Sequence, residues 1–116
     1  MAFSEPLAGR IRQLLHRRKG YSERRMFGGL CFLLNGNMCC GVVKDKLVLR
    51  LSPEAAGLAL EAGHTAPMDF TGRPMKNFVY VLPEGYEADK ALRDWVRMAA
   101  GHARSLPPKK APAPVR

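Results

Sequence analysis

The stretch MFGGLCFLLNGNMCCGVV, residues 26–43, decides the fold of this 116-residue chain. It places Asn35-Gly36 between two apolar runs, which is the strongest short-range signal for a β-hairpin, because both central positions of the tight turn need positive φ. A two-residue turn at this point brings Cys31 opposite Cys40 on the paired strand. The sequence therefore predicts two antiparallel strands joined at this dipeptide.

A second turn at Lys44-Asp45 adds a third strand, so that the two faces of the predicted sheet can be compared. Side chains alternate between the faces along each strand. The members of one face are all apolar or cysteine: Cys31, Leu33, Met38, Cys40, Val42, Leu47, Leu49 and Leu51. The other face mixes apolar with polar groups: Leu30, Phe32, Leu34, Asn37, Cys39, Gly41, Val43, Lys46, Val48 and Arg50. We expect the first face to form the core and the second to be partly covered or used for association.

Three helices are predicted from capping residues and from apolar residues at helical spacing. The first begins after Ser4 and stops at Gly20, the second begins after Ser52 and stops at Gly63, and the third covers residues 88–103.

The chain between the second and third of these helices divides into two parts. Residues 64–77 contain two prolines and Gly72, so we expect a loop or a short irregular strand there. Residues 78–82 have the composition of a strand. The predicted order is helix, three or more strands, helix, about two strands, helix, which is an α+β pattern.

The length of the chain fits one domain, because one core of this size buries enough surface to be stable and two would not. We expect the domain to cover residues 1–105 and residues 106–116, rich in proline and lysine, to form a flexible basic tail. No apolar run in the sequence reaches the ~20 residues of a membrane-spanning helix, and no secretory leader is visible. We therefore expect a soluble protein. Three cysteines cannot all pair in disulfides, which suits a reducing compartment, so we expect the protein in the cytoplasm.

A formal net charge of +9 invites a nucleic-acid-binding interpretation, since clustered Lys and Arg release counterions from phosphates. Residues 1–25 carry seven basic and two acidic side chains, a net +5, whereas residues 83–105 balance at four and four. The candidate nucleic-acid-binding residues are Arg17, Arg18, Lys19, Arg24 and Arg25. The first three can instead be solvent-exposed cations in the last turn of a helix, where they complement its dipole.

The three cysteines do not have the spacing of a metal site. A structural zinc site needs four ligands, and the adjacent Cys39 and Cys40 point to opposite faces of an extended strand. Cys31 and Cys40 face each other closely enough for a strained, easily reduced disulfide, but two buried thiols in a reducing compartment are the simpler interpretation. We expect three free thiols, no metal and no cofactor.

Other motifs give little support for an enzyme. Met26-Phe27-Gly28-Gly29 lacks the order of a nucleotide-binding loop, and its glycine pair is expected at a bulge or at a close approach of another backbone. No serine lies in a nucleophile motif. Asp69 with Arg73 remains, either as an acid with its partner or as a surface ion pair in a turn.

A series of motifs resembles the TfoX N-terminal domain family over roughly residues 3–107. The motifs are MFGG at 26–29, NG at 35–36 with Met38, VLR at 48–50, MDF at 68–70, GRPM at 72–75, FVYV at 78–81 and the closing helix with Trp95. The resemblance implies a two-layer α+β fold of the order α-β-β-β-α-β-β-α, with an antiparallel sheet of the secretion-chaperone-like type. It also implies a bacterial regulator of natural competence, which acts on transcription of DNA-uptake genes through a partner regulator. Full-length TfoX proteins add a C-terminal helical domain where this sequence has its basic tail, so a stand-alone copy need not regulate competence.

Three hypotheses for function follow. The first, which the resemblance favours, is a non-enzymatic module that binds a protein partner or a second copy of itself through a sheet face. Its candidate residues are Phe32, Leu34, Val43, Val48 and Arg50. The second is nucleic-acid binding by the basic residues given above and the tail, and the third is an enzyme with a loop site near Asp69 and Arg73. The resemblance transfers no catalytic residue to this chain.

Overall fold

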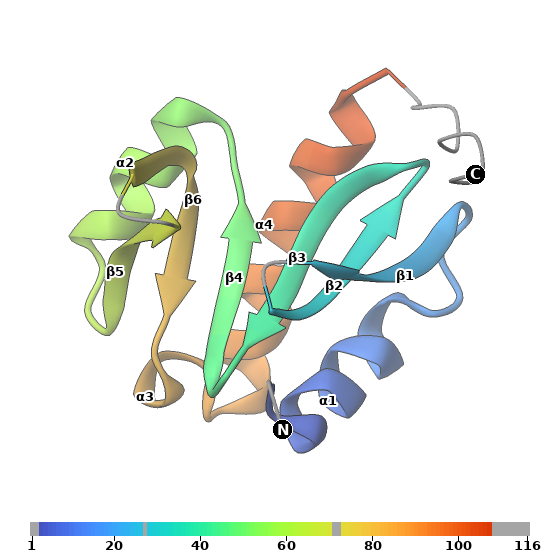
Figure 1. The fold of residues 1–116 in the computed structure, drawn as a ribbon, viewed down its shortest axis with the longest axis horizontal. Helices are drawn as coiled ribbons and strands as arrows, with labels where there is room; N and C mark the ends of the chain where they lie inside the picture. The colour runs from blue at the N-terminus through green and yellow to red at the C-terminus, as the bar shows by residue number, and fades with distance from the viewer. Residues whose placement is uncertain (1–2, 27, 71–72, 108–116) are drawn as a thin grey trace.

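The fold is a six-stranded antiparallel sheet with helices packed on one face (Figure 1). The computed structural model describes residues 3–26, 28–70 and 73–107, with the backbone alone for residues 69–70 and 73–76. The elements are α1 (Glu5–Leu15), β1 (Tyr21–Met26), β2 (Gly29–Leu34), β3 (Asn37–Val43), β4 (Lys46–Arg50), α2 (Pro53–Glu61), β5 (Thr65–Phe70), β6 (Arg73–Val81), α3 (Pro83–Tyr86) and α4 (Asp89–Ser105). The strands lie side by side in the order β1-β2-β3-β4-β6-β5.

The predicted fold class is confirmed. Every pair of neighbouring strands is antiparallel, and the helices form a second layer. Four strands precede α2, because residues 21–26 form a strand of their own along β2. Among the described residues, no helix combines the length and the apolar character that crossing a bilayer requires.

Two helices begin where the capping residues predicted them. The Oγ of Ser4 accepts a hydrogen bond from the backbone N–H of Leu7, and the Oγ of Ser52 accepts one from Ala55, each at 3.2 Å. Each bond satisfies one of the N–H groups that the first turn of a helix leaves without an intrahelical partner.

The end of α1 differs from the prediction. The helix ends at Leu15, and residues 16–20 form turns that lead into β1. Gly20 has a φ of 81°, and a Cβ at this position would lie 2.1 Å from Oδ1 of Asn35, so the turns need glycine here. The cations of residues 17–19 are therefore not in the last helical turn, where the helix-dipole explanation had placed them.

Both predicted hairpin turns are confirmed. Asn35 and Gly36 have φ values of 54° and 81°, as a tight turn of this type requires. Across the second turn, Val42 opposes Leu47 as expected.

The predicted pairing of Cys31 with Cys40 is wrong, because β3 carries a bulge. Between Leu33 and Phe32 the register shifts by one residue, so that Phe32 opposes Cys40. Cys39 is the extra residue in β3. Cys39 and Cys40 both join the main core instead of pointing to opposite faces, whereas Cys31 belongs to a cluster on the other side of the sheet.

The bulge reverses the predicted faces of β2. The main core lies between the sheet and all four helices, and its members from β2 to the end of β4 are Leu30, Phe32, Leu34, Cys39, Cys40, Val42, Leu47, Leu49 and Leu51. A second cluster on the other face comes from strands alone: Cys31, Leu33, Met38, Val48 and Met68. The face assignment is thus correct for β4 and the second half of β3, and wrong for β2 and the first half of β3.

Residues 64–77, expected as a loop or short irregular strand, form most of a hairpin. β6 pairs with β4 on one side and with β5 on the other, which makes β5 an edge strand. Pro67 fits within β5 because the outer side of an edge strand makes no hydrogen bonds to another strand. A proline, which has no backbone N–H, costs no such bond there. Pro67, one of the two prolines that indicated a loop, is therefore compatible with a strand in this position.

Candidate interaction surfaces

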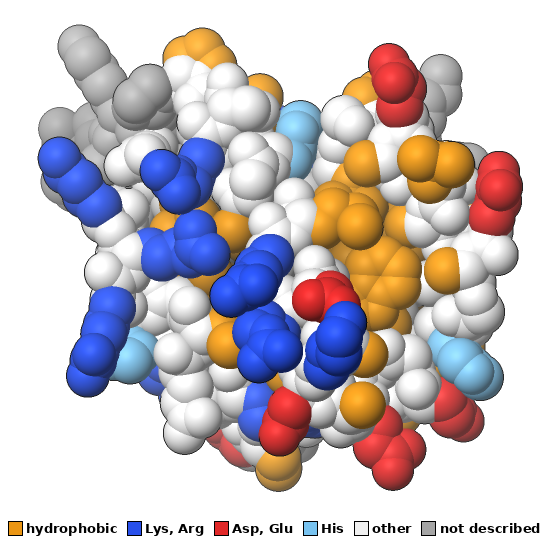
Figure 2. Space-filling view, turned by 180° about the vertical axis from the view of Figure 1, so that it is seen from behind, with side chains coloured by type: hydrophobic (Ala, Val, Ile, Leu, Met, Phe, Trp, Pro, Cys, Tyr) orange, Lys and Arg blue, Asp and Glu red, His pale blue; other side chains and the backbone are white. Residues whose placement is uncertain are grey.

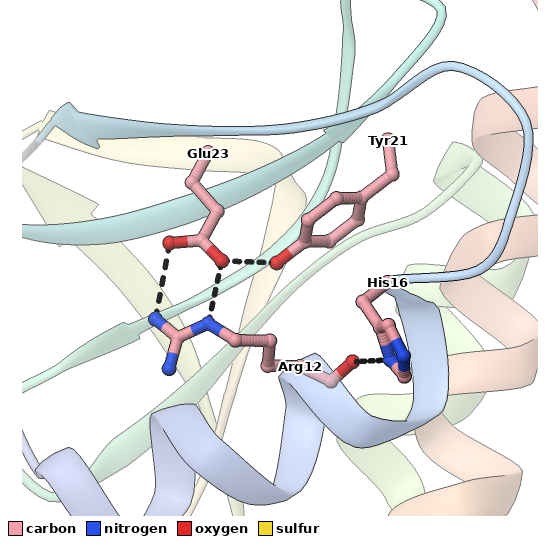
Figure 3. A network of polar contacts seen from close by, with 4 residues as sticks. All are labelled: Arg12, His16, Tyr21 and Glu23. Carbon is pink, nitrogen blue, oxygen red and sulfur yellow. Dashed lines mark hydrogen bonds and ion pairs between the residues drawn. The ribbon is translucent and has the colours of Figure 1, made fainter.

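A hydrogen-bonded network joins α1 to the edge strand β1 (Figure 3). The guanidinium of Arg12 donates to both carboxylate oxygens of Glu23, at 2.6 and 3.0 Å, and the Tyr21 hydroxyl donates to the same carboxylate. The bonds from Arg12 lower the pKa of Glu23, and the same pairing raises the pKa of Arg12. Burial, and then the bond to Glu23, raises the pKa of Tyr21. The network fixes β1 against the C-terminal half of α1.

The turns at residues 16–20 are held from two sides. Nδ1 of His16 lies 2.9 Å from the carbonyl oxygen of Arg12, at the end of the network (Figure 3). The backbone N–H of Asn35 donates to the carbonyl of Gly20 at 3.0 Å. The cations in these turns are thereby placed beside the turn that joins β2 and β3.

Three arginines lie on one flank of α4. At 100° per residue, Arg93, Arg97 and Arg104 fall within about 40° of one another around the helix. All three are exposed, whereas Val96 and Ala100 on the neighbouring stripe are buried against the core. α4 therefore presents three guanidinium groups along one flank, beside its buried face.

Two surface cavities connect this flank with the turns after α1. The larger, of about 280 Å³, is lined by Arg18, Lys19, Leu34, Asn35 and Arg104. The smaller, of about 110 Å³, is lined by Leu14, Arg18, Arg93, Val96 and Arg97. We name the cations of these two cavities the basic cluster: Arg18, Lys19, Arg93, Arg97 and Arg104. The helical side of the molecule shows a corresponding gathering of Lys and Arg side chains (Figure 2).

The basic cluster forms no ion pair with any other residue that the structure describes. Asp94, which lies between its members in the sequence, accepts a hydrogen bond from Lys90 at 2.9 Å. This bond is the main cause of the lowered pKa of Asp94, with Arg93 and Arg97 adding to the effect. The positive charge of the cluster is therefore largely open to solvent and to a ligand.

The five cations predicted as one nucleic-acid patch are divided by the structure. Arg18 and Lys19 belong to the basic cluster, and Arg17 is exposed in the same turns. Arg24 and Arg25 lie on β1 and line a separate surface cavity. That cavity also contains the acidic side chains of residues 5 and 23, so its charge is mixed.

The arginines of α4 were not among the predicted residues. Residues 83–105 hold as many acidic as basic side chains, and a net charge does not show that the arginines lie on one flank of the helix. The spacing of Arg93, Arg97 and Arg104, four and then seven residues, was the available signal, because it places them on one face of a helix.

The second surface is the sheet face opposite the helices, which we name the open sheet face. Around its buried cluster, four apolar side chains are half-buried: Met26, Val43, Phe78 and Tyr80. Nζ of Lys46 lies 5.1 Å from the centre of the Tyr80 ring, which is cation–π distance. Among the described residues, no helix contributes to this face.

The residues predicted for a protein-interaction face are divided between the two faces of the sheet. Phe32 and Leu34 are buried in the main core and cannot meet a partner, because the bulge turns β2 over. Val48 is buried within the open sheet face, and Val43 and Arg50 are half-buried.

A family model of the TfoX N-terminal domain matches residues 13–103. The chain belongs to the TfoX N-terminal domain family. The match runs from α1 to near the end of α4 and includes the basic cluster except Arg104. It confirms the resemblance drawn from the motifs. Comparison with curated proteins gives no match.

The cysteines of this TfoX N-terminal domain are buried and free of disulfide bonds. Burial raises the pKa of Cys31 to about 11, and the pKa of Cys40 is raised by a hydrogen bond with Cys39 and by burial. These two thiols therefore stay protonated near neutral pH, a state that neither attacks as a nucleophile nor binds a metal. Within the described part of the chain, no three His, Cys, Asp or Glu side chains gather as a metal site would need.

The remaining candidate, Asp69 with Arg73, falls in the hairpin of β5 and β6. The backbone pairs Asp69 with Pro74 and Phe70 with Arg73. The side chains of Asp69 and Arg73 lie outside the described part of the domain, so this site stays a prediction.

Proposed function

We propose that this TfoX N-terminal domain is a non-enzymatic regulatory module of the bacterial cytoplasm that binds a protein partner through its open sheet face. The chain belongs to the TfoX N-terminal domain family, and this membership supports a role like that of the competence regulators that the motifs resemble. The observation that carries the choice of surface is the strand-only cluster on the side of the sheet opposite the helices.

The composition of the open sheet face favours a protein partner. An antiparallel sheet with one solvated face usually shows polar residues there. This face instead holds five buried apolar side chains with Met26, Val43, Phe78 and Tyr80 half-buried around them. Methionine and aromatic residues are enriched at the centres of protein interfaces. A partner that covers this face would supply the second layer that the helices supply on the other side.

The polar groups of the open sheet face are cationic. Lys46, Val48 and Arg50 alternate along β4, so Lys46 and Arg50 share the face of Val48. Both are half-buried. We therefore expect the partner to carry carboxylates at the rim of its contact surface.

Several candidate nucleophiles have structural roles, which supports a non-enzymatic function. The hydroxyls of Ser4 and Ser52 accept the capping bonds of α1 and α2. Cys31 and Cys40 are buried with raised pKa values, so they lack the thiolate that a catalytic cysteine needs.

Lysine cross-linking in native lysate tests the surface. Lys46 lies on the open sheet face, and Lys90 lies on α4. We expect partner cross-links at Lys46 and none at Lys90. We also expect Val43→Gln to reduce partner capture at least tenfold.

A matched control is Leu58→Gln, which changes an apolar side chain of α2 that is 69% exposed. This variant should retain the partner, and circular dichroism should show that both variants are folded. Cross-links confined to Lys90, or equal losses in the two variants, would contradict the proposed surface.

A further inference from the structure

We propose that the basic cluster is a second binding site, which takes the phosphate backbone of duplex DNA across the groove between the end of α1 and α4. This inference is independent of the protein-binding function proposed for the open sheet face, because the two surfaces lie on opposite sides of the sheet.

The first argument is that the positive charge is assembled by the fold and left unpaired. Arg18 lines both cavities and so connects Lys19 and Arg104 on one side with Arg93 and Arg97 on the other. Other cations of the helical layer are neutralised by neighbours: Arg10 pairs with Asp89 at 3.0 Å, and Arg12 pairs with Glu23 at 2.6 Å. The five cations of the cluster pair with no described acid.

The second argument is the length of the row. From Arg93 to Arg104, α4 rises about 16 Å. One strand of a DNA duplex advances about 3.4 Å per phosphate along its axis, so the row spans about five phosphates. Arginine can form two parallel hydrogen bonds to a phosphate, so a row of arginines is suited to contact with the phosphate backbone of DNA.

The third argument distinguishes the duplex from single strands and from acidic proteins. Neither cavity is lined by an aromatic side chain on which an unpaired base could stack. The apolar residues that line the cavities, Leu14, Leu34 and Val96, are half-buried or buried in the core. The arginines at the centre of a protein interface usually lie beside aromatic anchors, and neither cavity has an aromatic lining residue. Cations without stacking or apolar anchors fit contact with the backbone of a duplex.

The fourth argument concerns the basic segment that follows α4. Nδ2 of Asn37 donates to the carbonyl oxygen of Pro107 at 2.9 Å, which fixes that residue beside the turn where Asn35 lines the larger cavity. In the sequence, Lys109 and Lys110 follow two and three residues later. Two further cations therefore follow, in the sequence, a residue that the structure places beside the larger cavity.

Fluorescence anisotropy with a labelled 24-base-pair duplex, measured from low to moderate salt, tests the site. Five phosphate contacts predict a slope of about −4.5 in a plot of log K against log salt concentration. Arg93→Gln with Arg97→Gln should make the slope shallower by about 2 and weaken binding roughly 10- to 100-fold at 0.1 M salt.

The matched control is Arg24→Gln with Arg25→Gln, which removes the same charge from β1. It should leave the slope within about half a unit of the unmodified protein. A single strand of the same length and polyglutamate of equal charge should both bind more weakly than the duplex. Circular dichroism and thermal melting confirm that each variant is folded.

Four results would overturn the proposal. They are the absence of duplex binding at 50 mM salt, an unchanged slope in the α4 variant, equal losses in the β1 variant, and binding of the single strand or of polyglutamate as tight as that of the duplex. Loss of the partner in the cross-linking experiment would leave this test unaffected.

Discussion

At the scale of single residues, the contact between Arg12 and Glu23 joins the first helix to the edge of the sheet. We expect Glu23→Gln to lower the free energy of unfolding by about 0.5–1 kcal/mol at pH 7, a value discounted because the Arg12 side chain is 44% exposed. The pKa of Glu23 is lowered in the folded state, so its contribution is present above the ordinary value of 4.5 and is lost as the pH falls through the folded-state pKa. Urea unfolding at pH 7 and pH 3 measures both effects.

The control for this variant is Glu87→Gln, which removes an exposed carboxylate that forms no ion pair with a described residue. It should change stability by less than about 0.5 kcal/mol at either pH. A difference between the Glu23 variant and the unmodified protein that is as large at pH 3 as at pH 7 would show that the loss does not come from the ion pair.

At the scale of elements, the close approach of β2 to β3 depends on glycine. A Cβ at Gly29 would lie 2.0 Å from the carbonyl oxygen of Val42, so the expected close backbone approach is confirmed for Gly29, whereas a Cβ at Gly28 would meet nothing within 4 Å. We expect Gly29→Ala to destabilise the protein by about 2–3 kcal/mol, because backbone must move to admit the methyl group. Thermal or urea unfolding measures the loss.

Gly57 provides the comparison, since it lies within α2 and a Cβ there would meet nothing within 4 Å. Gly57→Ala should stabilise the protein by about 0.5–1 kcal/mol through helix propensity. Equal effects of the two substitutions would contradict the role assigned to the packing of β2 against β3.

The elements also show which parts of the fold the sequence could predict. The caps at Ser4 and Ser52 and the turn at Asn35-Gly36 depend on local chemistry, and all three were predicted correctly. The bulge at Cys39 has no such local mark, because no glycine or proline distinguishes it. The bulge places Phe32 in the core beneath the helices. This packing depends on residues far away in the sequence, so no local pattern predicts it.

The basic cluster, too, could be predicted from the sequence only in part. Its two members after α1 are adjacent in the sequence and were predicted. Arg93, Arg97 and Arg104 join them only because α4 packs beside the end of α1, a contact that no local pattern specifies. The amphipathic spacing of α4 was visible, but the neighbour of its charged flank was not.

At the scale of the whole molecule, the reactivity of the cysteines measures the opening of both buried clusters, the main core and the cluster of the open sheet face. Cys39 and Cys40 lie in the main core and Cys31 lies under the open sheet face, all buried. We expect a thiol reagent to count three thiols in protein unfolded without reductant. In the folded protein, we expect the reagent to reach the thiols only when the structure around them opens transiently. The rates for the three sites should agree, since both clusters share the same sheet.

Faster labelling of Cys31 than of the other two would show that the open sheet face opens separately. A count of one thiol after unfolding would indicate a disulfide. Mass spectrometry of the labelled peptides distinguishes these outcomes.

The two described ends of the chain lie at opposite ends of β3. Phe3 is bridged to Lys44 at one end, and Pro107 is bonded to Asn37 at the other. A strand of seven residues separates these points by about 20 Å. A purification tag or fluorophore joined directly after Pro107 would begin near the cations, where an acidic peptide would compete with DNA. The amino end is the better site for such a handle in any assay of polyanion binding.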